Sequence, residues 1–141
     1  MAAASVVVQA WIAPAPRLQW NPLAPETIAA ITACDGRLYN RYDEGGYIVW
    51  FMKERPVFID SRQDPFPAQL VLEQIRIEQT GDYQRVFDRY RIGCALTAVG
   101  SPLASTLSRD GWKARAAGRG WTVYSRTGDM PPTETAHLEI Y

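Results

Sequence analysis

The pattern of apolar and polar residues predicts short helices and strands that alternate between residues 25 and 127. Helices are expected where apolar residues recur every three or four positions, and strands where β-branched and aromatic residues form short runs. Helices are therefore expected over 26–33, 43–52 and 64–79, with two more opening at Asp82 and at Ser101. Strands are expected over 37–40, 56–60 and 94–99, and a hairpin over 112–116 and 121–126.

Two of these helices have a predicted start and predicted faces. Asp64, followed by Pro65, is an N-cap signal, and Asp82 is the expected cap of the next helix. In the helix over 64–79, an apolar face lies opposite a polar one: Ala68, Val71, Leu72 and Ile75 against Glu73, Arg76 and Gln79. In the helix from Asp82, an apolar row should face the sheet and charged residues the solvent: Tyr83, Val86, Phe87 and Tyr90 against Arg85, Asp88 and Arg89.

The segment 43–52 is ambiguous. Its two glycines, Gly45 and Gly46, favour a turn, and the apolar run after them is too short for periodicity to separate helix from strand. A helix is preferred because the next run, PVFID at 56–60, is the better strand. PVFID and CALTAV (94–99) are expected to be adjacent central strands, since continuous apolar runs suit burial on both faces.

This order of elements predicts an α/β fold with a single domain. Strands separated by helices imply a mixed sheet with a parallel central part, closed by a C-terminal antiparallel hairpin, with helices packed on the sheet. The domain is expected over 25–127, after a leader or linker (1–24) and before a loosely attached tail (128–141). The apolar run over 1–13 is either a first strand or the end of a longer hydrophobic segment.

The composition argues against several kinds of partner and active site. Fifteen basic and fifteen acidic side chains cancel, which argues against nucleic acid as a partner because phosphate binding needs a basic surplus. The chain has a single histidine, His137, so it has no pair of histidines for a zinc site and no general base for a Ser/His or Cys/His catalytic pair. The two cysteines, Cys34 and Cys94, are 60 residues apart and are compatible either with two buried thiols or with one disulfide. No catalytic residue, metal ligand or cofactor is predicted.

Polar residues are concentrated in two stretches, 40–47 and 58–64. If PVFID is a parallel strand, the residues after it emerge at the sheet edge where α/β folds bind ligands. We therefore expect one concave binding surface, formed by Tyr42, Asp43, Tyr47, Asp60 and Arg62. A structural alternative predicts the same closeness, because Arg62 can bridge Asp43 and Asp60 and pin the loop to the strand. We favour the structural role for Asp60 and Arg62, and recognition for Tyr42 and Tyr47.

The same residues carry a family resemblance. The run RLYNRYDEGGYIVWFMKERPVFIDSRQD, then DRYRIGCALTAVGSPLASTL and the Trp-bearing hairpin, resembles the soluble segment that follows the membrane helices of bacterial glycosyltransferases using lipid-linked sugar donors. The resemblance spans about 23–126. More distantly, the chain is similar to the oligosaccharyltransferase catalytic subunit at Tyr42, Asp43, Gly45, Tyr47, Arg55, Pro56 and Asp60. It departs from that subunit in two ways. No Trp pair precedes Asp43, and Glu44 stands where the subunit has an aromatic residue.

The resemblance implies a non-catalytic, extracytoplasmic accessory domain of a larger membrane protein. Such a domain would recognise a glycan or peptide acceptor, or pack on the membrane portion of the same polypeptide. Two other functions compete with it. One is a small enzyme that uses Asp43, Glu44, Asp60 and Asp64 with a divalent metal. The other is a protein-interaction module anchored by tryptophans, with Trp50 and Trp112 expected in the core and Trp11 and Trp20 exposed.

Overall fold

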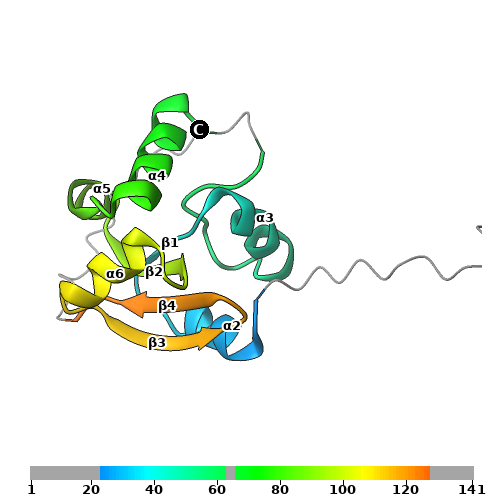
Figure 1. The fold of residues 1–141 in the computed structure, drawn as a ribbon. Helices are drawn as coiled ribbons and strands as arrows, with labels where there is room; N and C mark the ends of the chain where they lie inside the picture. The colour runs from blue at the N-terminus through cyan, green and yellow to red at the C-terminus, as the bar shows by residue number, and fades with distance from the viewer. Residues whose placement is uncertain (1–22, 63–65, 128–141) are drawn as a thin grey trace, which may run out of the picture.

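A computed structural model describes residues 23–62 and 66–127. The expectations for the leader up to residue 22, for Asp64 and for the tail after residue 127 lie outside these residues. The helices are α2 (Pro25–Thr32), α3 (Tyr42–Phe51), α4 (Ala68–Thr80), α5 (Gln84–Arg89) and α6 (Pro102–Arg109). The strands are β1 (Arg37–Tyr39), β2 (Ile92–Ala98), β3 (Lys113–Gly118) and β4 (Trp121–Ser125) (Figure 1).

The four strands form one mixed sheet in the order β1-β2-β4-β3. β1 and β2 are parallel, whereas β4 is antiparallel to both of its neighbours, β2 and β3. β3 is the outer strand of the hairpin, and its register shifts between Ala114 and Ala116. The structure confirms the predicted α/β class, with a parallel pair and a C-terminal antiparallel hairpin.

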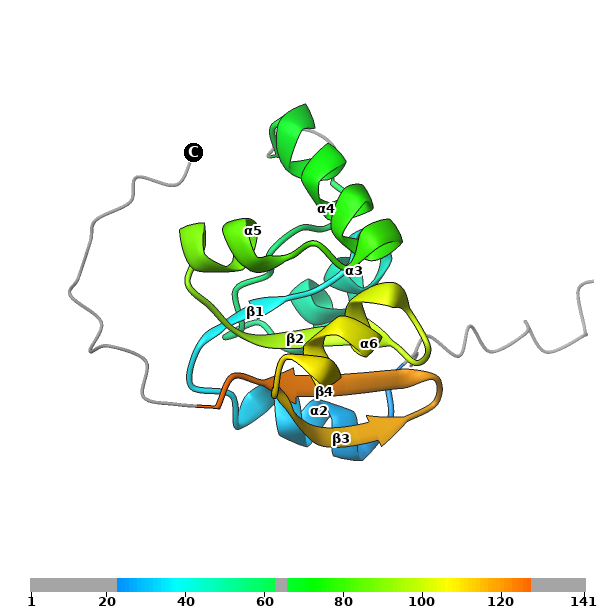
Figure 2. The ribbon, with the colours of Figure 1, turned by 60° about the vertical axis from the view of Figure 1, so that its left-hand side comes forward.

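Helices cover both faces of the sheet, which gives three layers (Figure 2). Side chains alternate between the faces along β2, so Ala95 joins one apolar cluster while Cys94 and Leu96 join the other. The first cluster lies under α4, α5 and α6 and is rich in aromatic rings, with Phe87 at its centre. The second cluster joins α2 and α3 to the sheet. Leu23, fully buried, belongs to this second cluster.

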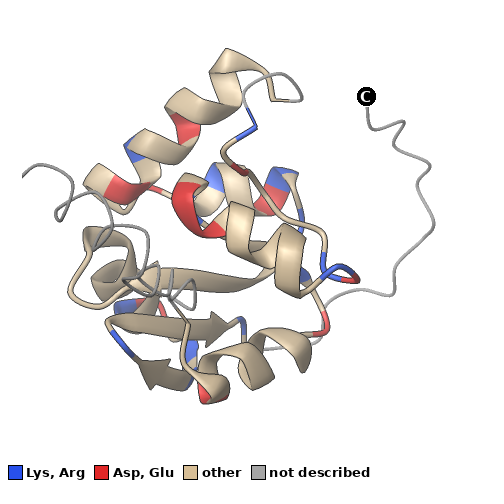
Figure 3. Ribbon diagram, turned by 90° about the vertical axis from the view of Figure 1, so that its right-hand side faces the viewer, with Lys and Arg blue, Asp and Glu red and all other residues tan. Residues whose placement is uncertain are grey.

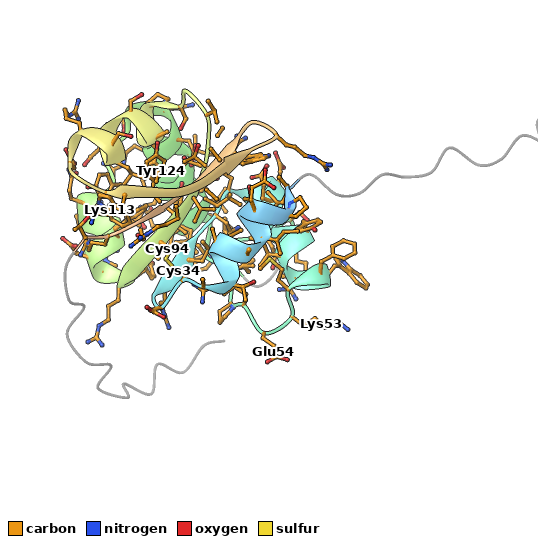
Figure 4. The ribbon with its side chains drawn as sticks, turned by 90° about the horizontal axis from the view of Figure 1, so that it is seen from below. Cys34, Lys53, Glu54, Cys94, Lys113 and Tyr124 are labelled. Carbon is orange, nitrogen blue, oxygen red and sulfur yellow. A yellow bond between two sulfur atoms is a disulfide. The ribbon has the colours of Figure 1, made fainter. Side chains whose placement is uncertain are left out.

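A disulfide links Cys34, just after α2, to Cys94 in β2 (Figure 4). Of the two states left open for these cysteines, the structure contains the disulfide. Both residues are buried in the second apolar cluster, so the bond ties α2 directly to the central strand.

The segment PVFID is not a strand, and the prediction that it pairs with CALTAV is wrong. The neighbours of β2 are β1 and β4, and no strand lies between α3 and α4 among the described residues. Instead, the side chain of Asn40 takes the place of a neighbouring strand. Its Nδ2 donates to the carbonyl of Ile59 at 2.6 Å, and its Oδ1 accepts from the backbone N–H of Phe58 at 2.8 Å. An apolar run can therefore be buried while an amide side chain satisfies its backbone.

The predicted starts of two helices are also wrong. α4 begins at Ala68, directly after Pro67, rather than near Asp64. α5 has Tyr83 as its N-cap residue, because the carboxylate of Asp82 pairs with Nη1 of Arg76 at 2.6 Å instead of capping the helix. The start of α6 is as predicted: Oγ of Ser101 accepts from the N–H of Ala104 at 3.1 Å.

The predicted faces are correct for α5 and only partly correct for α4. Three of the four apolar residues at α5 are buried, Tyr90 is half-buried, and its three charged residues are exposed. In α4 the buried residues are Glu73, Gln74 and Ile77, whereas Leu72 and Ile75 are exposed. Glu73 is stabilised there by two α5 arginines, at 3.7 Å from Arg85 and 3.5 Å from Arg89. Leu72 and Ile75 of the apolar face of α4 are therefore left exposed, while Val71 of the same face packs against the first apolar cluster.

The two tryptophans expected in the core differ in their burial. Trp112 is buried and its Nε1 donates to the hydroxyl of Tyr83 at 3.1 Å. Trp50 is 67 % exposed, so its assignment to the core is wrong. Trp11 and Trp20 lie outside the described residues.

Candidate functional site

A pocket of about 730 Å³ lies between the start of α3 and the exposed apolar face of α4. One wall is polar and comes from residues next to β1 and from α4; the other is apolar. The lining consists of Arg41, Tyr42, Asp43, Arg62, Phe66, Ala68, Val71, Leu72, Gln74, Ile75, Glu78 and Gln79. Basic and acidic positions are interspersed on these elements (Figure 3).

Arg62 is held at the pocket by a buried carboxylate. Its Nε and Nη2 donate to Asp60, with distances of 3.0 Å to Oδ1 and 2.6 Å to Oδ2, and its backbone N–H donates to Oδ1 at 2.8 Å. Asp60 is only 1 % exposed, whereas the Arg62 side chain is 64 % exposed. Burial raises the pKa of Asp60, but the hydrogen bonds from Arg62 outweigh it and lower that pKa below its ordinary value. A guanidinium with a fixed orientation thus faces solvent.

Arg41 lies near a second carboxylate and an aromatic ring. Its Nε is 3.8 Å from Oε2 of Glu44, and its guanidinium carbon is 5.5 Å from the ring centre of Trp121. Glu44 is buried beneath it, and burial raises its pKa although Arg41 acts in the opposite direction. Because Arg41 and Arg62 each have a carboxylate partner outside the pocket lining, the positive charge at the pocket is largely balanced by the protein itself.

Glu78 connects the pocket to the core. Its Oε1 accepts from the hydroxyl of Tyr39 at 2.8 Å, and burial raises the pKa of Glu78 despite this hydrogen bond and the nearby Arg41. Burial and the negative charge of Glu78 raise the pKa of Tyr39, which therefore stays protonated and keeps donating. The Glu78 carboxylate has a fixed position on the polar wall.

The double glycine places the start of α3 beside Asp60. Both glycines lie inside the helix, so the interpretation as a helix is confirmed and the turn is not formed. A Cβ on Gly45 would overlap the carbonyl of Ile59 and stand 2.7 Å from the Cα of Asp60. Only a residue without a Cβ permits this approach of helix and loop. At Gly46 the nearest atom would be Oγ of Ser61 at 3.4 Å, an ordinary contact.

The structure brings four of the five predicted site residues to this region. Tyr42, Asp43 and Arg62 line the pocket, and the Tyr42 hydroxyl donates to the carbonyl of Ser61 at 3.2 Å. Asp60 lies behind Arg62 as its buried partner. Tyr47 does not join them: it is buried in the second apolar cluster, on the α2 and α3 side of the sheet. The predicted reason, the end of a PVFID strand, does not apply, because the loop is positioned by Asn40 and Gly45 instead.

Sequence reasoning missed the α4 wall of the pocket. Val71, Leu72 and Ile75 form it, together with Phe66 from the preceding loop. Their shared face was visible in the sequence, but an apolar face is normally read as core. The signal that could have separated the two was Glu73 on the opposite face, whose carboxylate has two arginine partners in α5.

Within residues 23–62 and 66–127, no group of three or more His, Cys, Asp or Glu side chains could hold a metal ion. No helix in the described part of the chain is long and apolar enough to cross a membrane. Comparisons of the chain with protein-family models, with curated proteins and with solved structures found no match.

Proposed function

We propose that this chain is a non-catalytic, extracytoplasmic accessory domain of a glycosyltransferase-like membrane protein, and that its pocket recognises the acceptor. The observation that carries the proposal is the pocket between α3 and α4, where fixed hydrogen-bonding groups face an apolar wall. Pockets that bind small ligands combine apolar walls with a few placed polar groups in this way.

The charge balance of the pocket favours a glycan or a peptide as the ligand. Arg62 is neutralised by Asp60, and Arg41 lies near Glu44, so neither cation requires an anionic ligand. The remaining polar groups at the rim, Tyr42, Gln79 and the fixed guanidinium of Arg62, can exchange hydrogen bonds with hydroxyl or amide groups. Val71, Leu72 and Phe66 offer apolar surface to a sugar ring face or an aliphatic side chain.

The extracytoplasmic location is supported by the disulfide between Cys34 and Cys94. Disulfides persist in oxidising compartments and are rare where glutathione and thioredoxin keep thiols reduced. Both sulfurs are buried within an apolar cluster, as expected of a structural rather than a catalytic bond. This location agrees with the compartment that the sequence resemblance implies.

An NMR titration of the isotope-labelled chain tests acceptor binding. The probes are neutral oligosaccharides of two to four sugars and, separately, tetrapeptides with blocked ends. Binding should shift the amide signals of Asp43, Arg62 and Gln79 in at least one of the two series. Gln79→Ala, in the pocket lining, should weaken binding about threefold to tenfold, the effect of one lost hydrogen bond.

Gln69→Ala is the matched control, because Gln69 is an exposed α4 glutamine that does not line the pocket. Its affinity should equal that of the unmodified chain. No shift with any probe at millimolar concentration, or equal losses in both variants, would contradict the proposal.

A further inference from the structure

The pocket between α3 and α4 has more negative than positive charge. The charged residues of its lining and their ion-pair partners are two arginines and four carboxylates: Arg41, Arg62, Asp43, Glu44, Asp60 and Glu78. Both α3 and α4 contribute acidic positions to this set (Figure 3). The carboxylates exceed the arginines, and a concave surface with an excess of one charge attracts ligands of the opposite charge.

The two arginines do not satisfy the carboxylates around them. Arg62 is committed to Asp60, which leaves Arg41 as the other cation of the set. Its Nε is 3.8 Å from Oε2 of Glu44, too far for a hydrogen bond, and this buried oxygen has no hydrogen-bond partner among the described residues. Burial raises the pKa of Glu44 and of Glu78 more than the nearby Arg41 lowers it. Both carboxylates are therefore short of positive charge.

Two carboxylates of the lining are open to a ligand. Asp43 is exposed in the first turn of α3, and no basic side chain in the described part of the chain forms an ion pair with it. Glu78 accepts from the hydroxyl of Tyr39 through Oε1 at 2.8 Å, and no described residue donates to its Oε2. A cation in the pocket can therefore meet one carboxylate from α3 and one from α4.

The opposite wall indicates which kind of cation fits. Val71, Leu72 and Ile75 give this wall a mainly aliphatic surface. Such a surface suits a chain of methylene groups, which long basic side chains bury while their charged end stays at polar groups. Because Glu78 has one oxygen left for a ligand, it suits the point charge of an ammonium better than the planar fork of a guanidinium.

We propose that the pocket binds a lysine side chain of a peptide, with the methylene stem on the α4 wall and the ammonium at Asp43 and Glu78. An ammonium has three donors, so it can bond to both carboxylates and supply the positive charge that the site lacks. The inference rests on the proposed function and narrows its acceptor to a peptide with an accessible lysine.

NMR titrations with four blocked tetrapeptides test the inference. Each consists of glycine except at the second position, which is lysine, norleucine, arginine or glutamate. Norleucine keeps the methylene stem of lysine and lacks its charge. At low salt the lysine peptide should bind at least about tenfold more tightly than the norleucine peptide, because only lysine makes charged hydrogen bonds. This advantage should shrink at about 0.5 M salt, which screens charge attraction, and the glutamate peptide should bind most weakly.

Substitutions of the two carboxylates locate the ammonium. Asp43→Asn and Glu78→Gln should each weaken binding of the lysine peptide about threefold to tenfold and leave binding of the norleucine peptide unchanged. Glu54→Gln is the matched control, because Glu54 is an exposed acid outside the pocket lining, and both affinities should stay unchanged. Unchanged thermal midpoints show that the variants are folded. Asp43 is exposed, so its variant keeps the test valid if Glu78→Gln destabilises the fold.

Several results would overturn the inference. They are equal affinities for the lysine and norleucine peptides, tighter binding of the arginine peptide, and equal losses in Glu54→Gln and the two lining variants. Tighter binding of a glucosamine dimer than of the lysine peptide would instead assign the pocket to an amino sugar. Shifts with neutral probes but no gain from lysine would reject the cationic ligand and leave the acceptor pocket in place, so the two proposals can fail separately.

Discussion

Two regions of this molecule are stabilised in different ways. The C-terminal region, residues 83–125, consists of α5, three paired strands and α6, and its backbone groups bond to one another within these helices and between these strands. The loop region, residues 40–62, contains one helix and a long irregular segment. That segment is positioned by a few polar contacts, from Asn40, from Asp60 to Arg62, and by the close approach at Gly45.

The difference bears on how polar residues near a pocket are interpreted. In the loop region, the residues that look most like a binding site include those that hold the backbone in place. Asn40 and Asp60 are buried and satisfied, whereas Tyr42, Asp43 and Arg62 reach the pocket. A concentration of polar residues in a sequence therefore contains two populations, and burial separates them.

The largest loss of stability is expected from a substitution in the C-terminal region. Phe87→Ala removes a fully buried ring. Its centre lies 4.9 Å, 4.8 Å and 5.6 Å from the ring centres of Tyr39, Tyr83 and Trp112, respectively. The free energy of unfolding should fall by about 3–5 kcal/mol, as for other buried aromatic residues. Urea denaturation followed by circular dichroism measures it. A loss below about 1 kcal/mol would mean that this region does not depend on its apolar cluster.

The second largest loss of stability is expected from removing the disulfide, and it should be concentrated in the loop region. The Cys34–Cys94 disulfide closes a loop with a sequence separation of 60 that contains all of residues 40–62. The double substitution Cys34→Ser, Cys94→Ser should lower the free energy of unfolding by about 2–4 kcal/mol. Amide hydrogen exchange should accelerate more in α3 than in the hairpin of β3 and β4. Equal acceleration of exchange in both regions would contradict the view that the two regions are stabilised in different ways.

Neighbouring glycines provide a smaller and sharper test. Gly45→Ala should destabilise the protein by about 1–3 kcal/mol, because its Cβ overlaps backbone atoms at Ile59 and Asp60. Gly46→Ala, in the same helix, meets only Oγ of Ser61 and should be neutral or stabilising by about 0.5–1 kcal/mol through higher helix propensity. Thermal denaturation of both variants checks the pair, and a similar cost for both would reject the close approach.

The smallest effect expected is on the pH dependence of stability. Burial raises the pKa of Glu44 and of Glu78, so the folded state gains stability as pH falls through these raised values towards about 4.3. The pKa of Asp60 is lowered, so its contribution is present above about pH 3.9 and is lost as pH falls through the lower, folded value. The free energy of unfolding, measured by denaturant from pH 7 to 3, should therefore be highest at about pH 4. The double variant Glu44→Gln, Glu78→Gln should flatten the rise, and a steady decline from pH 7 would contradict it.

The sequence was most informative where regular structure and apolar burial coincide. The run from Cys94 to Ala98 is a central strand, α6 opens after Ser101 as predicted, and the hairpin forms where Gly118 and Gly120 separate two alternating runs. Each of these predictions depends on local preferences that act in the same direction as the fold.

The sequence was least informative where one contact between distant residues decides the outcome. PVFID has the pattern of a buried strand, yet Asn40 satisfies its backbone across 18 or 19 residues of sequence. In α4, Glu73 of the predicted polar face is buried beside two arginines of α5, whereas Leu72 and Ile75 of the predicted apolar face are exposed. At the candidate site, Tyr42, Asp43 and Arg62 do lie around one pocket, but the expected reason, the end of a PVFID strand, was wrong, because Asn40 and Gly45 position the loop instead. Tyr47 could not be separated from them, because its burial depends on how α3 packs against α2 and the sheet.

The irregular register of β3 affects how this protein behaves in concentrated solution. β3 is an edge strand, and an edge strand with free backbone groups is a template on which a second molecule can add a strand and begin to aggregate. Here Lys113 and Arg115 are exposed on that strand, and the shift between Ala114 and Ala116 interrupts its flat ladder. Both features oppose self-association through the sheet, which leaves the rest of the surface to make contacts with other molecules.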